Sequence, residues 1–179
     1  MKAFIALLLL AAASLPAFAD ATADCNRFEN PQIQITGCTS FIRKGSLQTE
    51  MLSMAYTNRG IAQGNLGRVE KAITDFSEAI RLDPKSPLAF YNRGNAYLDK
   101  KKLDLALADF NAAIANEPEF ALAYYNRGVV FELKGQRELC IADYQKALSL
   151  DPSITDAQER LHVLGIKPGT PISPIRGGV

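Results

Sequence analysis

A pattern of 34 residues occurs three times in succession between residues 53 and 154 of this 179-residue chain. We call equivalent positions of the three copies a register. One register holds glycine in every copy, at residues 60, 94 and 128, and both 94 − 60 and 128 − 94 equal 34. A repeat of this length is typical of stacked supersecondary units, so it constrains the fold more than any other feature does. Other registers hold an aromatic, small or proline residue in every copy: Tyr56, Phe90 and Tyr124; Ala72, Ala106 and Cys140; Phe76, Phe110 and Tyr144; Ala79, Ala113 and Ala147; Pro84, Pro118 and Pro152.

Each copy has the pattern of two helices. The first half carries an aromatic residue and then a glycine four residues later, which places both on one helical face. In the middle copy, Ala106, Phe110 and Ala113 share a face of the second half. Pro118 then ends that helix, because the residue before a proline is disfavoured in the helical conformation. No such unit can bury its apolar face alone, so the sequence predicts an all-α chain of stacked units.

The pattern resembles the tetratricopeptide repeat, which has an aromatic residue, glycine and tyrosine in its first helix and alanine, phenylalanine and alanine in its second. The resemblance implies antiparallel helix hairpins that stack as a right-handed α-solenoid. It implies full units at 53–86, 87–120 and 121–154, followed by a capping helix at 155–166. The middle copy meets the pattern at Phe90, Gly94, Tyr97, Ala106, Phe110, Ala113 and Pro118.

Two registers depart from the family pattern together. Leucine usually precedes the glycine in this family, whereas this chain has an arginine there, and an aspartate directly precedes the aromatic residue of the second helix. We expect either a ladder of ion pairs between the helices of each unit or independently solvated charges, since surface pairs contribute only about 0–1 kcal/mol. The residues concerned are Arg59, Arg93 and Arg127, with Asp75, Asp109 and Asp143.

Residues 1–19 have the features of a bacterial export signal. Lys2 supplies the positive start, residues 4–13 are apolar, and Ala17-Phe18-Ala19 is a small-residue cleavage motif. The apolar run is shorter than the roughly 20 residues that a membrane-spanning helix needs. We therefore expect cleavage after Ala19, a periplasmic or secreted protein, and no stable membrane insertion.

The expected export to an oxidising compartment determines how we interpret the cysteines. Cys25 and Cys38 both precede the repeats, and an oxidising compartment favours a disulfide between them. A metal or redox role would need more ligands or a tighter motif. Cys140 occupies a register where the family has a small buried residue, so we expect a packed free thiol, with a link between chains as the alternative.

The segments outside the three full copies have their own patterns. We interpret residues 20–52 as a degenerate N-terminal half-repeat, whose helix begins at Asn30-Pro31 and ends near Lys44. At the other end, residues 167–179 are rich in proline and glycine, and we expect a flexible tail there.

Little in the sequence points to catalysis or to a charged ligand. Without Lys2 the mature chain has 20 − 1 = 19 basic and 19 acidic side chains, so there is no electrostatic case for nucleic acid. With His162 as the single histidine, no Ser-His-Asp or Cys-His system can be assembled. We expect no enzyme, no cofactor and no metal; an envelope enzyme of unrecognised type is the alternative.

The family resemblance points to the inner face of the array, because first helices of tetratricopeptide units line a groove that holds partner segments. The asparagines expected there share one register, and each amide offers both a donor and an acceptor, which suits the main chain of an extended peptide. This row is similar to the asparagine ladder in the superhelical domain of O-linked N-acetylglucosamine transferases; alternatively, the amides are only solvated. Carried over by position, the groove residues are Asn58, Asn92, Asn126, Tyr91, Tyr125, Asn95, Leu88 and Leu122.

The carboxylate clamp of some co-chaperone members is not reproduced. Thr57 and Leu122 stand at its basic positions, Asn126 stands at its arginine position, and only Asn92 matches. We therefore expect a protein-protein interaction module that binds a protein or peptide segment in a mostly uncharged groove, as a scaffold in the cell envelope. A self-associating structural protein, and hence a homo-oligomer, is the alternative.

Overall fold

The computed structural model describes residues 16–45 and 48–166, with side chains from residue 21 onward. The expected tail lies outside these residues, as does the expected export signal except for residues 16–19, which begin the first helix. Regular structure in the described residues is helical throughout: α1 (Pro16–Cys25), α2 (Pro31–Lys44), α3 (Thr49–Asn65), α4 (Val69–Leu82), α5 (Pro87–Asp99), α6 (Leu103–Asn116), α7 (Ala121–Leu133), α8 (Arg137–Leu150) and α9 (Thr155–Val163).

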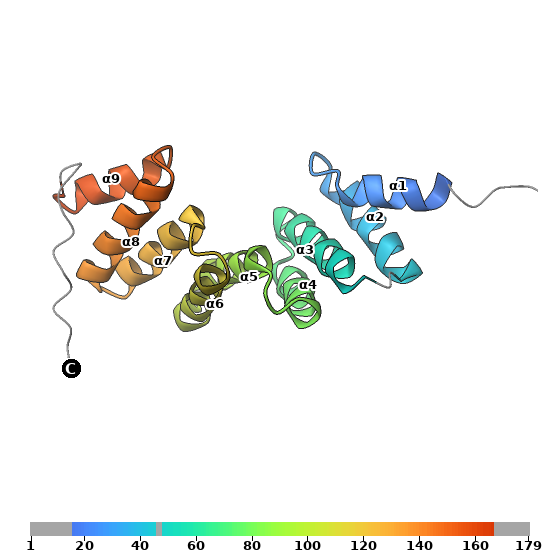
Figure 1. The fold of residues 1–179 in the computed structure, drawn as a ribbon, viewed down its shortest axis with the longest axis horizontal. Helices are drawn as coiled ribbons and strands as arrows, with labels where there is room; N and C mark the ends of the chain where they lie inside the picture. The colour runs from blue at the N-terminus through green and yellow to red at the C-terminus, as the bar shows by residue number, and fades with distance from the viewer. Residues whose placement is uncertain (1–15, 46–47, 167–179) are drawn as a thin grey trace, which may run out of the picture.

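The helices pair in chain order and the pairs stack into an arc (Figure 1). The hairpins α3–α4, α5–α6 and α7–α8 are the three predicted repeats, α1–α2 precedes them, and α9 packs on α8. The first helices α3, α5 and α7 lie toward the open side of the arc, whereas α4 and α6 lie on its outer side (Figure 1). The all-α solenoid of stacked hairpins is confirmed. None of the described helices is long and apolar enough to cross a membrane.

Local signals place the helix ends where the sequence predicts them. The Asn30 side chain accepts hydrogen bonds from the backbone of Gln32 and Ile33, both at 3.1 Å, and so caps α2. Ser86 does the same for α5 through the Ala89 N–H, with Pro87 in the first turn. The first helix of the first repeat is longer than its counterparts, with 17 residues in α3 against 13 in α5 and 13 in α7.

Each of the hairpins α3–α4, α5–α6 and α7–α8 closes through an aromatic ring that lies on the glycine of the partner helix. A Cβ atom added to Gly94 would come within 2.8 Å of the Phe110 ring, so a larger residue at this position would force the helices apart. The same contact joins Gly60 to Phe76 and Gly128 to Tyr144. This close approach explains why the glycine and the aromatic register repeat together.

Each hairpin buries its remaining apolar face against the next unit. Ala72 and Phe76 of α4 form one buried cluster with Ala96 of α5, and Phe110 of α6 is buried with Val130 of α7. The last cluster joins α8 to α9, which thereby covers the exposed end of the array. Because the cores lie between units, the stack is held by nearest-neighbour contacts.

The leading segment, which we interpreted as a degenerate half-repeat, contains two paired helices. Helix α1 packs along α2 and supplies the missing first helix. The predicted disulfide between Cys25 and Cys38 joins these two helices. Gly37 of α2 permits the contact, since an added Cβ would lie 2.5 Å from the Cys25 backbone nitrogen. The glycine is on the second helix here, so the repeat register does not reveal this hairpin.

The arginine and aspartate registers form a ladder of ion pairs, the first of the two arrangements that the sequence left open. The Arg93 Nε and Nη2 atoms each donate to a carboxylate oxygen of Asp109 at 2.8 Å, with 20% and 6% of the two side chains exposed. Arg59 pairs with Asp75 and Arg127 with Asp143 in the same two-bond geometry. Each carboxylate raises the pKa of its arginine, chiefly through these hydrogen bonds.

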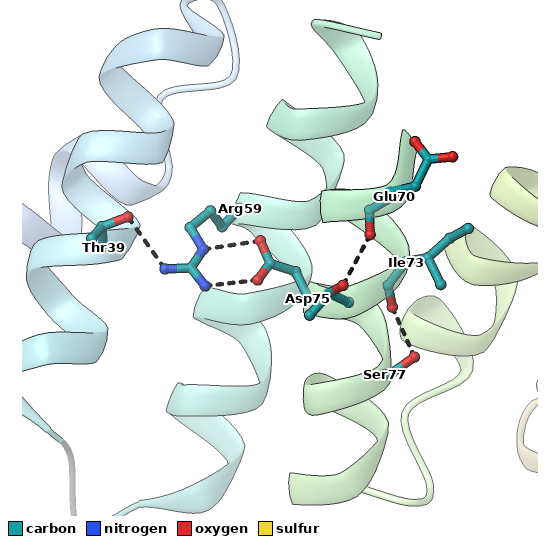
Figure 2. A network of polar contacts seen from close by, with 7 residues as sticks. Thr39, Arg59, Glu70, Ile73, Asp75 and Ser77 are labelled. Atoms are coloured by element: carbon teal, nitrogen blue, oxygen red, sulfur yellow. Dashed lines mark hydrogen bonds and ion pairs between the residues drawn. The ribbon is translucent and has the colours of Figure 1, made fainter. Parts of the chain in front are cut away.

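Each arginine also reaches back to the preceding unit. Arg59 Nη1 donates to the Thr39 hydroxyl of α2 at 3.3 Å, so the guanidinium links α2, α3 and α4 (Figure 2). Arg93 donates in the same way to Ser77 at 3.1 Å. In the last repeat the acceptor is the Asn111 side chain, at 2.7 Å from Arg127. The ladder therefore connects neighbouring units as well as the helices within one unit.

A double-mutant cycle tests this ladder. We expect Arg93→Ala and Asp109→Ala to show a coupling free energy of at least about 1 kcal/mol, because either single change leaves a largely buried charge without its partner. Urea unfolding of the four proteins measures it. The exposed pair Glu78–Arg81 on α4 is the control, and its coupling should stay below about 0.5 kcal/mol. Equal coupling in the two cycles would contradict a structural role for the ladder.

Candidate functional site

The inner face of the arc carries uncharged groups from α3, α5 and α7. We define this inner face by residues of the first helices that share registers or contact one another: Met54, Leu88, Leu122, Tyr91, Tyr125, Asn92, Asn95, Asn126 and Asp99. Asp99 is the single charged residue of this set. The surface can therefore offer apolar contact, amide and phenol hydrogen bonding, and one negative charge.

Three large apolar side chains at one register are exposed on this face. Leu88 and Leu122 were predicted groove residues, and they are 46% and 43% exposed. Met54 occupies the same register in α3, since 88 − 54 equals 34, and it is 62% exposed. Met54 was not among the groove residues expected from the sequence, although the repeat register itself identifies it. We call Met54, Leu88 and Leu122 the apolar row.

The three asparagines do not form a row of equivalent open amides. Asn58 is only 9% exposed, and its Nδ2 atom donates to the Asn26 side chain at 3.0 Å and to the Cys25 carbonyl at 3.4 Å. The end of α1 therefore covers the amide that was expected in the groove. Asn58 fastens the leading hairpin to the first repeat, and the accessible asparagine amides of the inner face begin at α5.

The other two asparagines differ from each other as well. Asn92 Nδ2 donates to the Leu88 carbonyl of its own helix at 2.8 Å. Asn126 Nδ2 instead crosses to α5, where it donates to Asn95 Oδ1 at 2.7 Å and to the Tyr91 hydroxyl at 3.1 Å. The structure thus brings Asn126, Asn95 and Tyr91 together in one cluster between the second and third repeats, while Asn92 stays outside it.

The predicted tyrosines are held by neighbouring rings. The Tyr91 ring lies 4.8 Å from the ring of Phe120, centroid to centroid, in the turn before α7. Tyr125 lies 5.7 Å from Tyr144, which places it against α8. Burial raises the pKa of the Tyr125 phenol above its ordinary value. Both rings are fixed and only partly accessible, so they offer preorganised contact area.

A hollow of about 220 Å³ opens between the first and second repeats. Its walls come from α3, α4 and α5, and Asn92, Asn95 and Asp99 line it on the α5 side. Ile61 and Phe76 supply apolar wall. The hollow lies next to the apolar row, because Asn92 is one turn from Leu88 along α5.

The C-terminal end of the inner face is closed by a network around Glu132. Its carboxylate accepts a hydrogen bond from the Tyr144 hydroxyl at 2.5 Å and one from Arg160 of α9 at 3.1 Å. Burial, together with this bond, raises the pKa of Tyr144. The arginine is thereby paired and fixes α9 in place.

Two further observations bear on chemistry at this surface. The described residues contain no group of three histidine, cysteine or acidic side chains placed to hold a metal. Cys140, the free thiol, is buried in the cluster between α8 and α9, and burial raises its pKa, which keeps it protonated and unreactive.

Comparison with known proteins agrees with the architecture. A family model described as TPR repeat matches residues 65–101 and 94–135, and one described as tetratricopeptide repeat matches residues 121–154. Together these matches run from residue 65 to 154, which is 90 of 179 residues. No curated protein matches the sequence.

Several solved structures share the fold. The first TPR of Spaghetti (RPAP3), bound to the HSP90 peptide SRMEEVD, is 26% identical with a TM-score of 0.63, over 65% of this chain and 94% of that one. MamA from Desulfovibrio magneticus is 28% identical with a TM-score of 0.70, over 83% and 81%. YrrB, described as having an unusual peptide-binding site, is 20% identical with a TM-score of 0.67, over 82% and 73%, and shows the fold alone.

The different surroundings of the asparagines predict different effects of substitution. Asn58→Ala should lower the free energy of unfolding by about 1–2 kcal/mol, since it removes donors from the buried Cys25 carbonyl and from Asn26. Asn92→Ala should change it by less than about 0.5 kcal/mol, because its bond is to an exposed carbonyl of its own helix. Chemical denaturation of both variants measures the difference. Equal losses would show that the two amides are equivalent after all.

Proposed function

We propose, from the premise that this chain belongs to the tetratricopeptide repeat family, that it binds a protein or peptide segment on the inner face of its arc. The observation that carries the proposal is the apolar row. Met54, Leu88 and Leu122 repeat at one register and are exposed side by side in successive units, where solvation alone would favour polar residues.

The surroundings of the row support a binding role. Asn95, Asn126 and Tyr91 hold one another, and the cores between units fix the helices that carry them. A surface that is already ordered loses little conformational entropy when a ligand binds. Peptide binding by a structural neighbour, the first TPR of Spaghetti, supports the same class of function.

We place this binding in the bacterial cell envelope, where the protein would act as a scaffold. The export features of residues 1–19 support this, and so does the Cys25–Cys38 pair, because disulfides persist in oxidising compartments. Among the described side chains of α1, those of residues 21–25, Ala21 and Cys25 are buried, and both follow the expected cleavage after Ala19. These two packing residues would remain in the processed chain.

Site-directed photo-crosslinking in the native host tests the proposal. A benzoylphenylalanine placed at Leu88 should capture a partner polypeptide in the periplasmic fraction. The matched control is Leu105, which is 47% exposed against 46% for Leu88 but lies on α6 at the outer side of the arc. Identical products from the two positions, or none from Leu88, would contradict binding at the inner face. Absence of the protein from the periplasmic fraction would contradict export.

A further inference from the structure

The hollow between the first two repeats is large enough for one long side chain of a bound segment. Its volume of about 220 Å³ is several times the roughly 30 Å³ that a water molecule occupies in the liquid. Ile61 and Phe76 can contact the aliphatic part of such a side chain. The polar groups of the hollow then determine what its tip must be.

Asp99 brings a carboxylate to this hollow. It is exposed, and within residues 16–45 and 48–166 it takes part in no ion pair. It is the last residue of α5, where the negative end of the helix dipole makes an acid unfavourable. The same register holds Asn65 in α3 and Leu133 in α7, so the fold does not require a charge there.

Asn92 adds an acceptor to the same hollow. One N–H of its Nδ2 atom donates to the Leu88 carbonyl, so the amide keeps its Oδ1 acceptor and a second N–H for a ligand. No donor among the described residues reaches that oxygen. The other polar residues that line the hollow, Asn65, Asn92 and Asn95, are amides that can both donate and accept, so Asp99 supplies the single charge among its lining residues. A carboxylate there suits a group that donates hydrogen bonds and carries positive charge, as ammonium and guanidinium groups do.

The basic residues nearest to Asp99 do not fill this role. Lys100 pairs with Glu70 of α4, and Lys101 and Lys102 lie in the turn to α6. In the described part of the chain, no basic side chain lines the hollow. At the far end of the inner face, Arg160 is paired with Glu132.

We propose that the hollow receives a lysine or arginine side chain of the bound segment, next to apolar side chains that lie on Leu88 and Leu122. The inner face then selects segments that are apolar and basic, and rejects acidic ones. This inference rests on the proposed function and specifies its ligand. It separates this chain from its neighbour Spaghetti, whose peptide SRMEEVD carries three acidic residues.

Selection from a random 12-residue peptide library displayed on phage tests the inference on the full folded chain. The wild type should enrich peptides with aliphatic residues and at least one lysine or arginine. Asp99→Asn should retain the aliphatic preference and lose the basic one. The best selected peptide should bind that variant about tenfold more weakly, as expected for loss of one charge-assisted hydrogen bond. Its affinity for the wild type should fall with added salt.

Controls separate the failure of this inference from the failure of the proposed function. Glu138→Gln removes a charge from an exposed position on α8 and should select like the wild type. A synthetic SRMEEVD peptide should bind more weakly than the selected peptides. Enrichment of peptides without a basic residue, or unchanged selection by Asp99→Asn, would overturn the inference alone. Equal enrichment by the wild type and by a Leu88→Ser, Leu122→Ser double variant would overturn both.

Discussion

The guanidinium groups of Arg59, Arg93 and Arg127 connect three helices each, and the geometry of the array depends on them. Two donors of each group bind an aspartate of the same hairpin, and a third reaches the preceding unit. The apolar clusters between units supply most of the burial, but such contacts are not directional. A planar group with fixed donors also sets the relative position of the helices it joins.

This connection matters for function because the inner face is assembled from separate units. Leu88 and Leu122 belong to different hairpins, and their spacing is only as well defined as the stacking. On the inner side, Asn126 adds a second link through Asn95 and Tyr91. The ends are closed differently: Asn58 and the disulfide hold the leading hairpin, and Glu132 with Arg160 holds α9. A segment that binds there would therefore meet a surface whose ends are both held by side-chain contacts.

The repeat made the helices, the hairpins and the pairing of Arg93 with Asp109 predictable, because each depends on registers within one copy. Contacts between a repeat and an element outside the repeats were not predictable in this way. Asn58 shares its register with Asn92, yet only the fold of α1 over α3 decides that it is covered. The leading hairpin does not follow the repeat register, since its glycine is on the second helix. Asp99 has no counterpart in the other repeats, so its importance follows from the hollow it lines.

The central claim is that the inner face of this tetratricopeptide array holds a polypeptide segment, and chemical-shift mapping tests it most directly. The isotopically labelled protein would be titrated with a segment identified by crosslinking. The account predicts that the largest amide shifts fall on α5 and α7, around Leu88, Asn92 and Leu122. Shifts confined to α4 and α6, on the outer side of the arc, would contradict it.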